Sequence, residues 1–230
     1  MKDLAPGAIA PAGEAALPPA LEQEFLCRAR QRCGRKGEMV IARGSNATEV
    51  FLIRTGRVQA ILYSGSGREV ILREIGPGHI FGGMATLDGR ERCASAVVSE
   101  AGQLAWMSGP RFREFLGEVP GAGLWMASQL ATRIRNLSDK VLELTTLPVA
   151  GRVQAELLRL AAPHPVVDDQ VRISPLPTHA ELAARIGSHR EAVSRELGQL
   201  AREGLLRQSG RSLAILSFSR LQALHARFSR

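Results

Sequence analysis

The 230-residue sequence has no long run of apolar residues. No stretch reaches the ~18 consecutive uncharged apolar residues that a membrane-spanning helix needs. Residues 1–20, which are rich in Ala and Pro, also lack the continuous apolar segment of a secretory signal. We therefore expect a cytoplasmic protein with no membrane partner.

Cysteine is also scarce. The chain has three, Cys27, Cys33 and Cys93, and an odd number cannot all pair. In a chain without an export signal they are expected to be free thiols, which excludes a disulfide-stabilised secreted scaffold. An iron–sulfur cluster commonly takes four ligands, so three cysteines are too few and a structural role is the favoured interpretation.

The residue patterns of common catalytic sites are missing from the sequence. There are no paired carboxylates, no Ser-His-Asp set and no GxxxxGK[ST] phosphate loop. A cupin-type metal enzyme needs about three His or carboxylate ligands on facing strands, and His79 is the one histidine within the strand-rich residues 33–107. We predict that the protein is not an enzyme and holds no metal, with a cupin-like metal enzyme as the remote alternative.

Acidic residues are few in the last third of the chain. The whole sequence has 30 basic and 22 acidic residues, a net charge of +8. Residues 148–230 hold 12 basic and 7 acidic groups, or +5, whereas the longer segment 1–147 holds only +3. A small basic domain indicates an anionic partner, with nucleic acid ahead of a membrane surface.

Most of the first half of the chain has the pattern of short strands. Residues 1–20 are expected to form a flexible arm, because they lack periodicity and aromatic residues, and a short helix is expected over 21–30. Over 33–107, short β-rich runs alternate with Gly-containing turns. This pattern predicts an antiparallel sandwich or barrel.

A long helix is predicted over residues 119–147. Its apolar residues recur at spacings of four, three, four and three, which is the a/d seam of a coiled coil. The seam consists of Leu130, Ile134, Leu137, Val141 and Leu144. This stripe could pack on the chain's own barrel, but the pattern favours a dimer interface. Pro148 interrupts the helix and marks a hinge.

Two helices separated by a glycine turn are predicted within residues 178–206. Thr178 and Glu181 have the spacing of a capping box at the start of the first helix. Gly187 follows that helix, where a left-handed backbone allows a sharp turn. Ser188 with Glu191 is expected to form a second capping box. Together with a hairpin over 205–216, the pattern predicts a winged helix-turn-helix.

The second of these helices has side chains suited to reading DNA. Arg190, Glu191 and Arg195 share its outward side with Ser194. Arginine can donate two hydrogen bonds to guanine, and glutamate can accept one from cytosine. An ordinary helical hairpin with a solvated charged face is the alternative. The candidate DNA-binding residues are Thr178, Ser188, His189, Arg190, Glu191, Ser194 and Arg195.

Three separate segments of the chain resemble the CRP/FNR family of bacterial transcription regulators. The first, FLIRTGRV at residues 51–58, is similar to a strand-turn-strand of the family's barrel. The second, GPGHIFG at 76–82 with DGRERCA at 88–94, resembles its phosphate-binding cassette. The third, GSHREAVSR at 187–195, is similar to its recognition-helix signature.

The resemblance implies an α+β architecture in four parts. These are a flexible arm at residues 1–20, an effector-sensing antiparallel β-barrel of jelly-roll type at 21–118, a dimerisation helix at 119–147 and a winged helix-turn-helix at 148–230. It implies a homodimer that binds double-stranded DNA at a pseudo-palindromic site and contacts RNA polymerase. The expected mechanism is a ligand-linked repositioning about residues 137–148.

By the same resemblance, Arg190, Glu191 and Arg195 read bases in each half-site. The family divides between TGTGA-like and TTGAT-like half-sites. Arg190 with Glu191 and Arg195 is closer to the first usage, whereas Ser194 before Arg195 is that of the second. Both half-sites therefore remain open.

The family's phosphate cradle corresponds to a second set of residues. Arg92, with the backbone amides of Cys93 and Ala94, lies at the position that binds a cyclic phosphate, and Gly82 allows a close backbone approach. Members that bind cAMP follow Phe-Gly with a Glu that accepts from the ribose, and here that position is Gly83. A lost acceptor for a buried hydroxyl costs about 1–3 kcal/mol, which weighs against cAMP.

The nature of the effector stays open at this point. The base-facing pair on the family's dimer helix, usually Thr-Ser, is Leu137-Ser138 here. A cyclic nucleotide is one possible effector. The alternative is a member without a nucleotide effector, which senses redox state through Cys93, binds haem through His79 or Cys93, or is constitutive.

Overall fold

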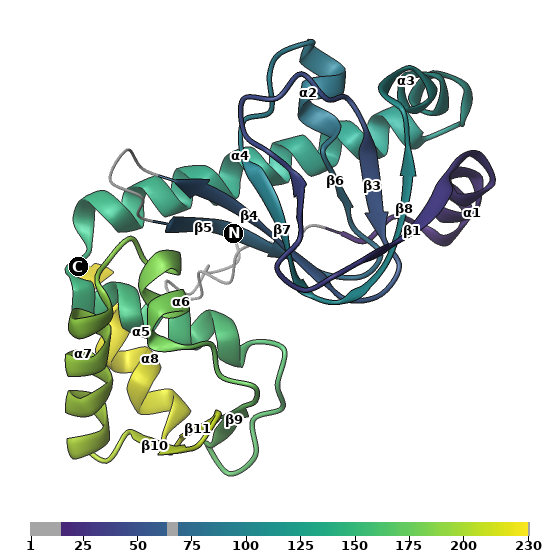
Figure 1. The fold of residues 1–230 in the computed structure, drawn as a ribbon. Coiled ribbons are helices and arrows are strands. Elements are labelled where there is room, and N and C mark those ends of the chain that lie inside the picture. Colours follow the sequence, from purple (N-terminus) through teal and green to yellow (C-terminus); the bar gives the residue numbers. More distant parts are fainter. Residues whose placement is uncertain (1–14, 64–68, 230) are drawn as a thin grey trace, which may run out of the picture. The chain divides into compact units, whose positions relative to one another are not determined.

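The computed structural model describes residues 15–63 and 69–229 (Figure 1). They form two units, one up to Ile134 and one from Arg135 onward, so the division falls inside a long helix. Among the described residues, no helix is both long and apolar enough to cross a membrane.

The described part of the first unit contains two four-stranded antiparallel sheets (Figure 1). The sheet orders are β1-β8-β3-β6 and β2-β7-β4-β5. The predicted barrel is thus an open sandwich of jelly-roll type. Its strands are β1 (Arg30–Gly34), β2 (Met39–Ile41), β3 (Val50–Ile53), β4 (Arg57–Tyr63), β5 (Glu69–Ile75), β6 (Ile80–Phe81), β7 (Ser95–Glu100) and β8 (Gly102–Met107).

Apolar side chains fill the space between the two sheets. Val58 and Ile61 of β4 are buried from one sheet, while Phe51 of β3 is buried from the other. Phe51 stacks on Phe81 with ring centroids 5.0 Å apart. This core fixes the short segment that runs from β6 into α2 (Gly83–Asp88), and that segment carries two of the predicted effector residues.

Two further helices cover the outside of this sandwich. They are α1 (Pro19–Arg28) and α3 (Gly109–Glu118), and each has a proline in its first turn, where the missing N–H costs no hydrogen bond. Phe25 of α1 packs edge-on against Phe112 and Phe115 of α3, with centroids 6.5 and 5.7 Å away. All three rings are fully buried.

The predicted N-terminal arm extends too far into the chain. Most of it, residues 1–14, lies outside the described residues. Leu17, however, is buried in the core beside α1, and its backbone N–H donates to the carbonyl of Gly78 at 2.7 Å. Because α1 already begins at Pro19, the end of the predicted arm belongs to the folded unit.

The long helix α4 (Ala122–Thr146) matches the prediction of a helix over 119–147 to within three residues at its start and one at its end. Its first turn is anchored in the first unit, where Ala122 and Met126 are buried. Leu130 packs partly buried against the same core. The rest of the predicted seam is exposed in the single chain: Ile134 (65%), Leu137 (51%), Val141 (60%) and Leu144 (39%).

The second unit is a winged helix-turn-helix, as predicted. After α5 (Val149–Ala161) come α6 (His179–Arg185) and α7 (Arg190–Arg202), and α8 (Phe218–Ala226) with a short 3-10 turn (Arg227–Ser229) closes the chain. The wing is a sheet of order β10-β11-β9, with bounds β9 (Val171–Ile173), β10 (Leu206–Ser209) and β11 (Ser212–Ile215).

Residues 166–173 do not form a complete hairpin of their own. Val167 and Gln170 make an isolated bridge, but β9 pairs with β11 of the wing, with Val171 opposite Ile215. Residues 171–173 are apolar at alternate positions, so they bury two side chains in the core of the unit only as part of the larger sheet.

Candidate nucleic-acid interface and effector cradle

The helix-turn-helix begins with the capping box that the sequence predicts. The Thr178 hydroxyl accepts from the Glu181 backbone N–H at 3.2 Å, and the Glu181 carboxylate accepts from the Thr178 backbone N–H at 2.7 Å. Thr178 also donates its hydroxyl to that carboxylate at 2.9 Å. These bonds use the side chain of Thr178 to hold the start of α6.

The second predicted capping box is wrong. The N-cap of α7 is His189, whose side chain makes no capping hydrogen bond. Gly187 has a φ of +60°, and the turn that it makes returns the Ser188 backbone N–H to the carbonyl of Ala183 at 2.9 Å. This is the Schellman pattern that ends α6. Ser188 is therefore a buried residue of the turn rather than the cap of the next helix.

The recognition helix α7 has the predicted two faces. Val193, Leu197 and Leu200 are buried toward the core, and Glu191 and Arg195 are exposed on the other side. Arg190, the first residue of the helix, and His189 before it are exposed as well. Side chains at a helix N-terminus can reach base edges, while the free backbone N–H groups there favour phosphate.

Ser194 contacts the first helix of the motif, which the sequence reasoning missed. The His179 Nδ1 atom lies 2.7 Å from the Ser194 hydroxyl, so the two share a hydrogen bond between α6 and α7. Both side chains are half-buried. The signal in the sequence is a histidine at the first position of α6, but its partner 15 residues away becomes apparent only once the helices are placed together.

The wing adds basic groups to the same unit. β10 and β11 pair from Leu206 opposite Ile215 to Ser209 opposite Ser212. Arg207 and Arg211 are exposed on this hairpin. Exposed arginines on a wing are suited to phosphate oxygens, which position a protein on DNA without selecting its sequence.

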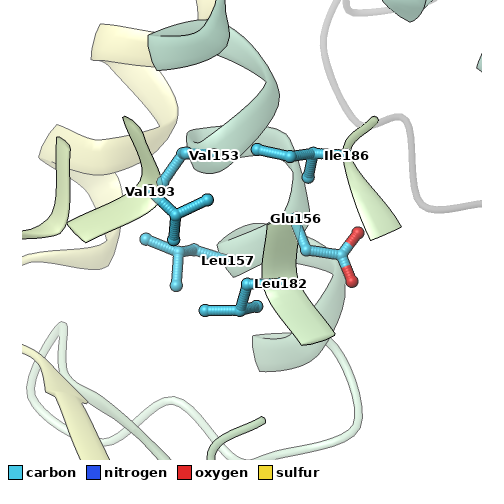
Figure 2. Close-up of a pocket in the computed structure, with 6 residues that line it drawn as sticks. All are labelled: Val153, Glu156, Leu157, Leu182, Ile186 and Val193. Atoms are coloured by element: carbon cyan, nitrogen blue, oxygen red, sulfur yellow. The ribbon is translucent and has the colours of Figure 1, made fainter. Parts of the chain in front are cut away.

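The interior of the helix-turn-helix is tightly packed. Figure 2 shows Val153 and Leu157 of α5 facing Leu182, Ile186 and Val193 of the two following elements. The space among them holds no water-sized volume. In Figure 2 the carboxylate of Glu156 extends away from these apolar side chains. This region is therefore the core that supports α7.

Arg92 forms the centre of the predicted effector cradle. It is 4% exposed, and its two terminal nitrogens donate to the backbone carbonyls of Gly82 and, at 2.6 Å, of Glu49. The Glu49 carboxylate lies 3.8 Å away, and the Arg92 Nε is buried without a hydrogen-bond partner. Burial lowers the pKa of this guanidinium, which the Glu49 charge offsets in part.

Gly82 and Gly83 have different roles beside this arginine. Gly82 has a φ of +86°, and a Cβ there would lie 2.8 Å from the Glu49 carbonyl oxygen and 3.0 Å from Arg92 Nη1. A Cβ on Gly83 would lie 3.3 Å from the Met126 side chain. Gly82 thus allows the arginine to approach the backbone, whereas Gly83 supplies no side-chain acceptor.

The other predicted effector residues are divided between the two units. Cys93 is exposed and Ala94 half-buried directly after Arg92. An open hollow of about 640 Å³ adjoins them, lined by Arg43, Gly44, Asn46, Gly89, Arg90, Glu91, Arg92 and Cys93. Leu137 and Ser138 are exposed on the part of α4 that belongs to the second unit.

We expect Gly82→Ala to destabilise the first unit by about 1–3 kcal/mol, because the left-handed backbone and the close carbonyl both oppose a Cβ. Gly117→Ala on α3 is the matched control, since a Cβ there meets no atom within 4 Å and alanine favours helix. Thermal unfolding of both variants measures the difference. Equal melting temperatures would contradict the cradle geometry.

Models of two protein families match this chain. The cyclic nucleotide-binding domain matches residues 32–118, and the Crp-like helix-turn-helix domain matches residues 151–224.

Individual proteins are similar over most of the chain. The cyclic AMP receptor protein of Thermus thermophilus is 33% identical over 179 residues, which cover 77% of this chain and 80% of that protein. A CRP-like cAMP-activated global transcriptional regulator of Mycobacterium tuberculosis is 28% identical, with 81% and 84% covered. The structure of the c-di-GMP responsive global regulator CLP of Xanthomonas campestris has a TM-score of 0.76 at 23% identity, with 86% and 99% covered.

Proposed function

Because this chain belongs to the CRP/FNR family of transcription regulators, we propose that it works as a homodimer whose two α7 helices read a pseudo-palindromic DNA site. The observation that carries the proposal is the exposed charged set Arg190, Glu191 and Arg195 on one face of a helix whose other face is buried.

The chemistry of these three side chains supports the reading of G·C base pairs. Each arginine can donate to the O6 and N7 atoms of a guanine, and Glu191 can accept from the N4 amine of a cytosine. The exposed Arg207 and Arg211 of the wing suit contacts with phosphate, whereas the hydroxyl and backbone N–H of Thr178 are used within the capping box. The regulator acts in the bacterial cytoplasm, where its DNA is, and by resemblance to its family it contacts RNA polymerase.

The first unit is the effector domain, and we infer that its ligand carries an anionic group that Arg92 binds. The buried Nε of Arg92 has no partner, and its terminal nitrogens are satisfied by carbonyls that a phosphate would replace. Gly83 gives no side-chain acceptor for a ribose hydroxyl, so cAMP is disfavoured within this class. A redox signal at the exposed Cys93 beside Arg92 is the second candidate.

Selection of bound sequences from random double-stranded DNA tests the proposal. The enriched DNA is expected to contain two inverted half-sites rich in G·C pairs, about 10 base pairs or ~34 Å apart from centre to centre. Enrichment of a single unpaired site, or none above random DNA in any effector condition tested, would overturn it.

The same selection with cAMP, cGMP and a cyclic dinucleotide, paired with calorimetry, tests the effector. Arg92→Gln removes the positive charge at the cradle and is expected to abolish the binding of any phosphate ligand. If Arg92→Gln still binds a phosphate ligand, the effector site lies elsewhere in the protein.

A further inference from the structure

Two buried carboxylates of the second unit lie on α4 and α5, the helices before and after Pro148. Glu143 of α4 and Glu156 of α5 are each 5% exposed. Arg159 joins them: its Nη2 lies 2.5 Å from a Glu143 carboxylate oxygen, and its Nη1 forms an ion pair with Glu156. Arg159 therefore bridges α4 and α5, the two helices on either side of the helix break at Pro148.

Two more cations complete this arrangement. Lys140 lies 3.6 Å from the Glu143 carboxylate, and Arg185 at the end of α6 lies 3.5 Å from that of Glu156. Burial, and after it the charge of Arg159, lowers the pKa of the Lys140 ammonium. We refer to the five residues together as the hinge network: Lys140, Glu143, Glu156, Arg159 and Arg185.

Other contacts join the same three helices. Arg152 of α5 donates from Nη1 to the Ile186 carbonyl at 2.7 Å, at the end of α6. The Leu144 side chain lies 3.0 Å from the position that a Cβ on Gly187 would take. The last turns of α4 thus touch the turn that precedes the recognition helix.

We propose that the hinge network is a positioning device, which locks the helix-turn-helix to the last turns of α4 and so sets the distance between the two recognition helices of a dimer. The proposal rests on the proposed function. The exposed seam residues Leu137, Val141 and Leu144 lie on the same turns of α4 as Lys140 and Glu143. If these turns of α4 pair in the dimer, ion pairs fix each helix-turn-helix relative to the dimer axis. The helix-turn-helix is then not joined to α4 by a flexible linker alone.

Charge suits this role better than apolar contact. Buried carboxylates must each keep a cation in place, because an unpaired buried charge is strongly destabilising. Apolar side chains can slide past one another at less cost, since their attraction has no direction. The hinge network therefore favours one placement of α5 and α6 on α4. Residues 137–148 then move as a rigid body with the helix-turn-helix, instead of forming the hinge expected from the resemblance.

The readout that follows from a positioning role is the preferred spacing of the half-sites. The wild-type protein is expected to bind the selected site about tenfold more tightly than a site in which the spacing between the half-sites differs by one base pair. This loss is similar to that caused by one mismatched base pair in a recognition site. Glu143→Gln is expected to reduce this preference to about threefold or less, with little change on random DNA, whose phosphates it does not touch. Glu203→Gln, the same substitution at an exposed residue of the unit, should leave the preference unchanged.

A second variant separates positioning from stability. Glu143→Leu with Arg159→Met replaces the central pair by apolar side chains, which commonly keeps or raises stability. We expect it to melt at or above the wild-type temperature and still bind with a broadened spacing preference. A double variant that keeps the tenfold preference would overturn the proposal. A wild-type protein without any paired-site preference would instead refute the proposed function.

Discussion

Glu191→Ala and Arg195→Ala are each expected to remove most of the discrimination between the target site and random DNA. One specific base contact contributes about 1–3 kcal/mol, and a homodimer loses it twice, so the specific affinity should fall roughly 30-fold to 10⁴-fold. Binding to random DNA should change little for Glu191→Ala, because it depends on phosphate contacts and on salt rather than on base edges.

Fluorescence anisotropy on specific and random duplexes, over a range of salt concentrations, measures this difference. Arg202→Ala is the matched control, since Arg202 is exposed on the same helix but lies in its last turn, away from the N-terminal end. It is expected to keep the discrimination. An equal loss of affinity on specific and random DNA would refute the assignment of Glu191 and Arg195 as base readers.

Ser194 bears on the half-site that these residues select. The sequence leaves two half-site types open, and Ser194 is the residue that points to the TTGAT-like one. In the structure its hydroxyl shares a hydrogen bond with His179. A hydroxyl held between two helices is less free to contact a base, which favours selection by the three charged side chains.

The elements of the fold were largely predictable because their patterns are local. Short β-rich runs between Gly-containing turns predicted the strands, and the 3.5-residue apolar spacing predicted α4. Leu17 was missed because one apolar residue among Ala and Pro has no period, and its burial depends on the distant Gly78. The cap at Ser188 was wrong because Gly187 draws Ser188 into the preceding turn.

The sites were less predictable than the elements. Resemblance located Arg92, but its burial depends on the carbonyl of Glu49, which is 43 residues away in sequence. The hinge network was not anticipated, because Glu143 and Arg159 look like ordinary solvated charges on amphipathic helices. Only the folded arrangement of α4 and α5 brings their charged groups within 2.5 Å and buries Glu143.

Leu137→Glu is expected to convert the dimer to monomers. Ile134, Leu137 and Val141 are each more than half exposed in the single chain, on one stripe of α4. Burial of such a side chain contributes about 1.5–3 kcal/mol. A two-fold axis along this seam would bring both copies of residue 137 close together, so the variant would bury two like charges as well as lose two apolar contacts.

Sedimentation distinguishes the species, since one chain has a mass of 24.8 kDa and a dimer has twice that mass. Leu142→Glu is the matched control: Leu142 is 57% exposed on the same helix but lies off the a/d stripe, so its variant should stay dimeric. The monomer should also bind the paired site no better than a single half-site, because the second contact is then no longer intramolecular. If Leu137→Glu remains a dimer, the interface lies elsewhere on the chain. The hinge network then cannot set the distance between the two recognition helices through this stripe of α4.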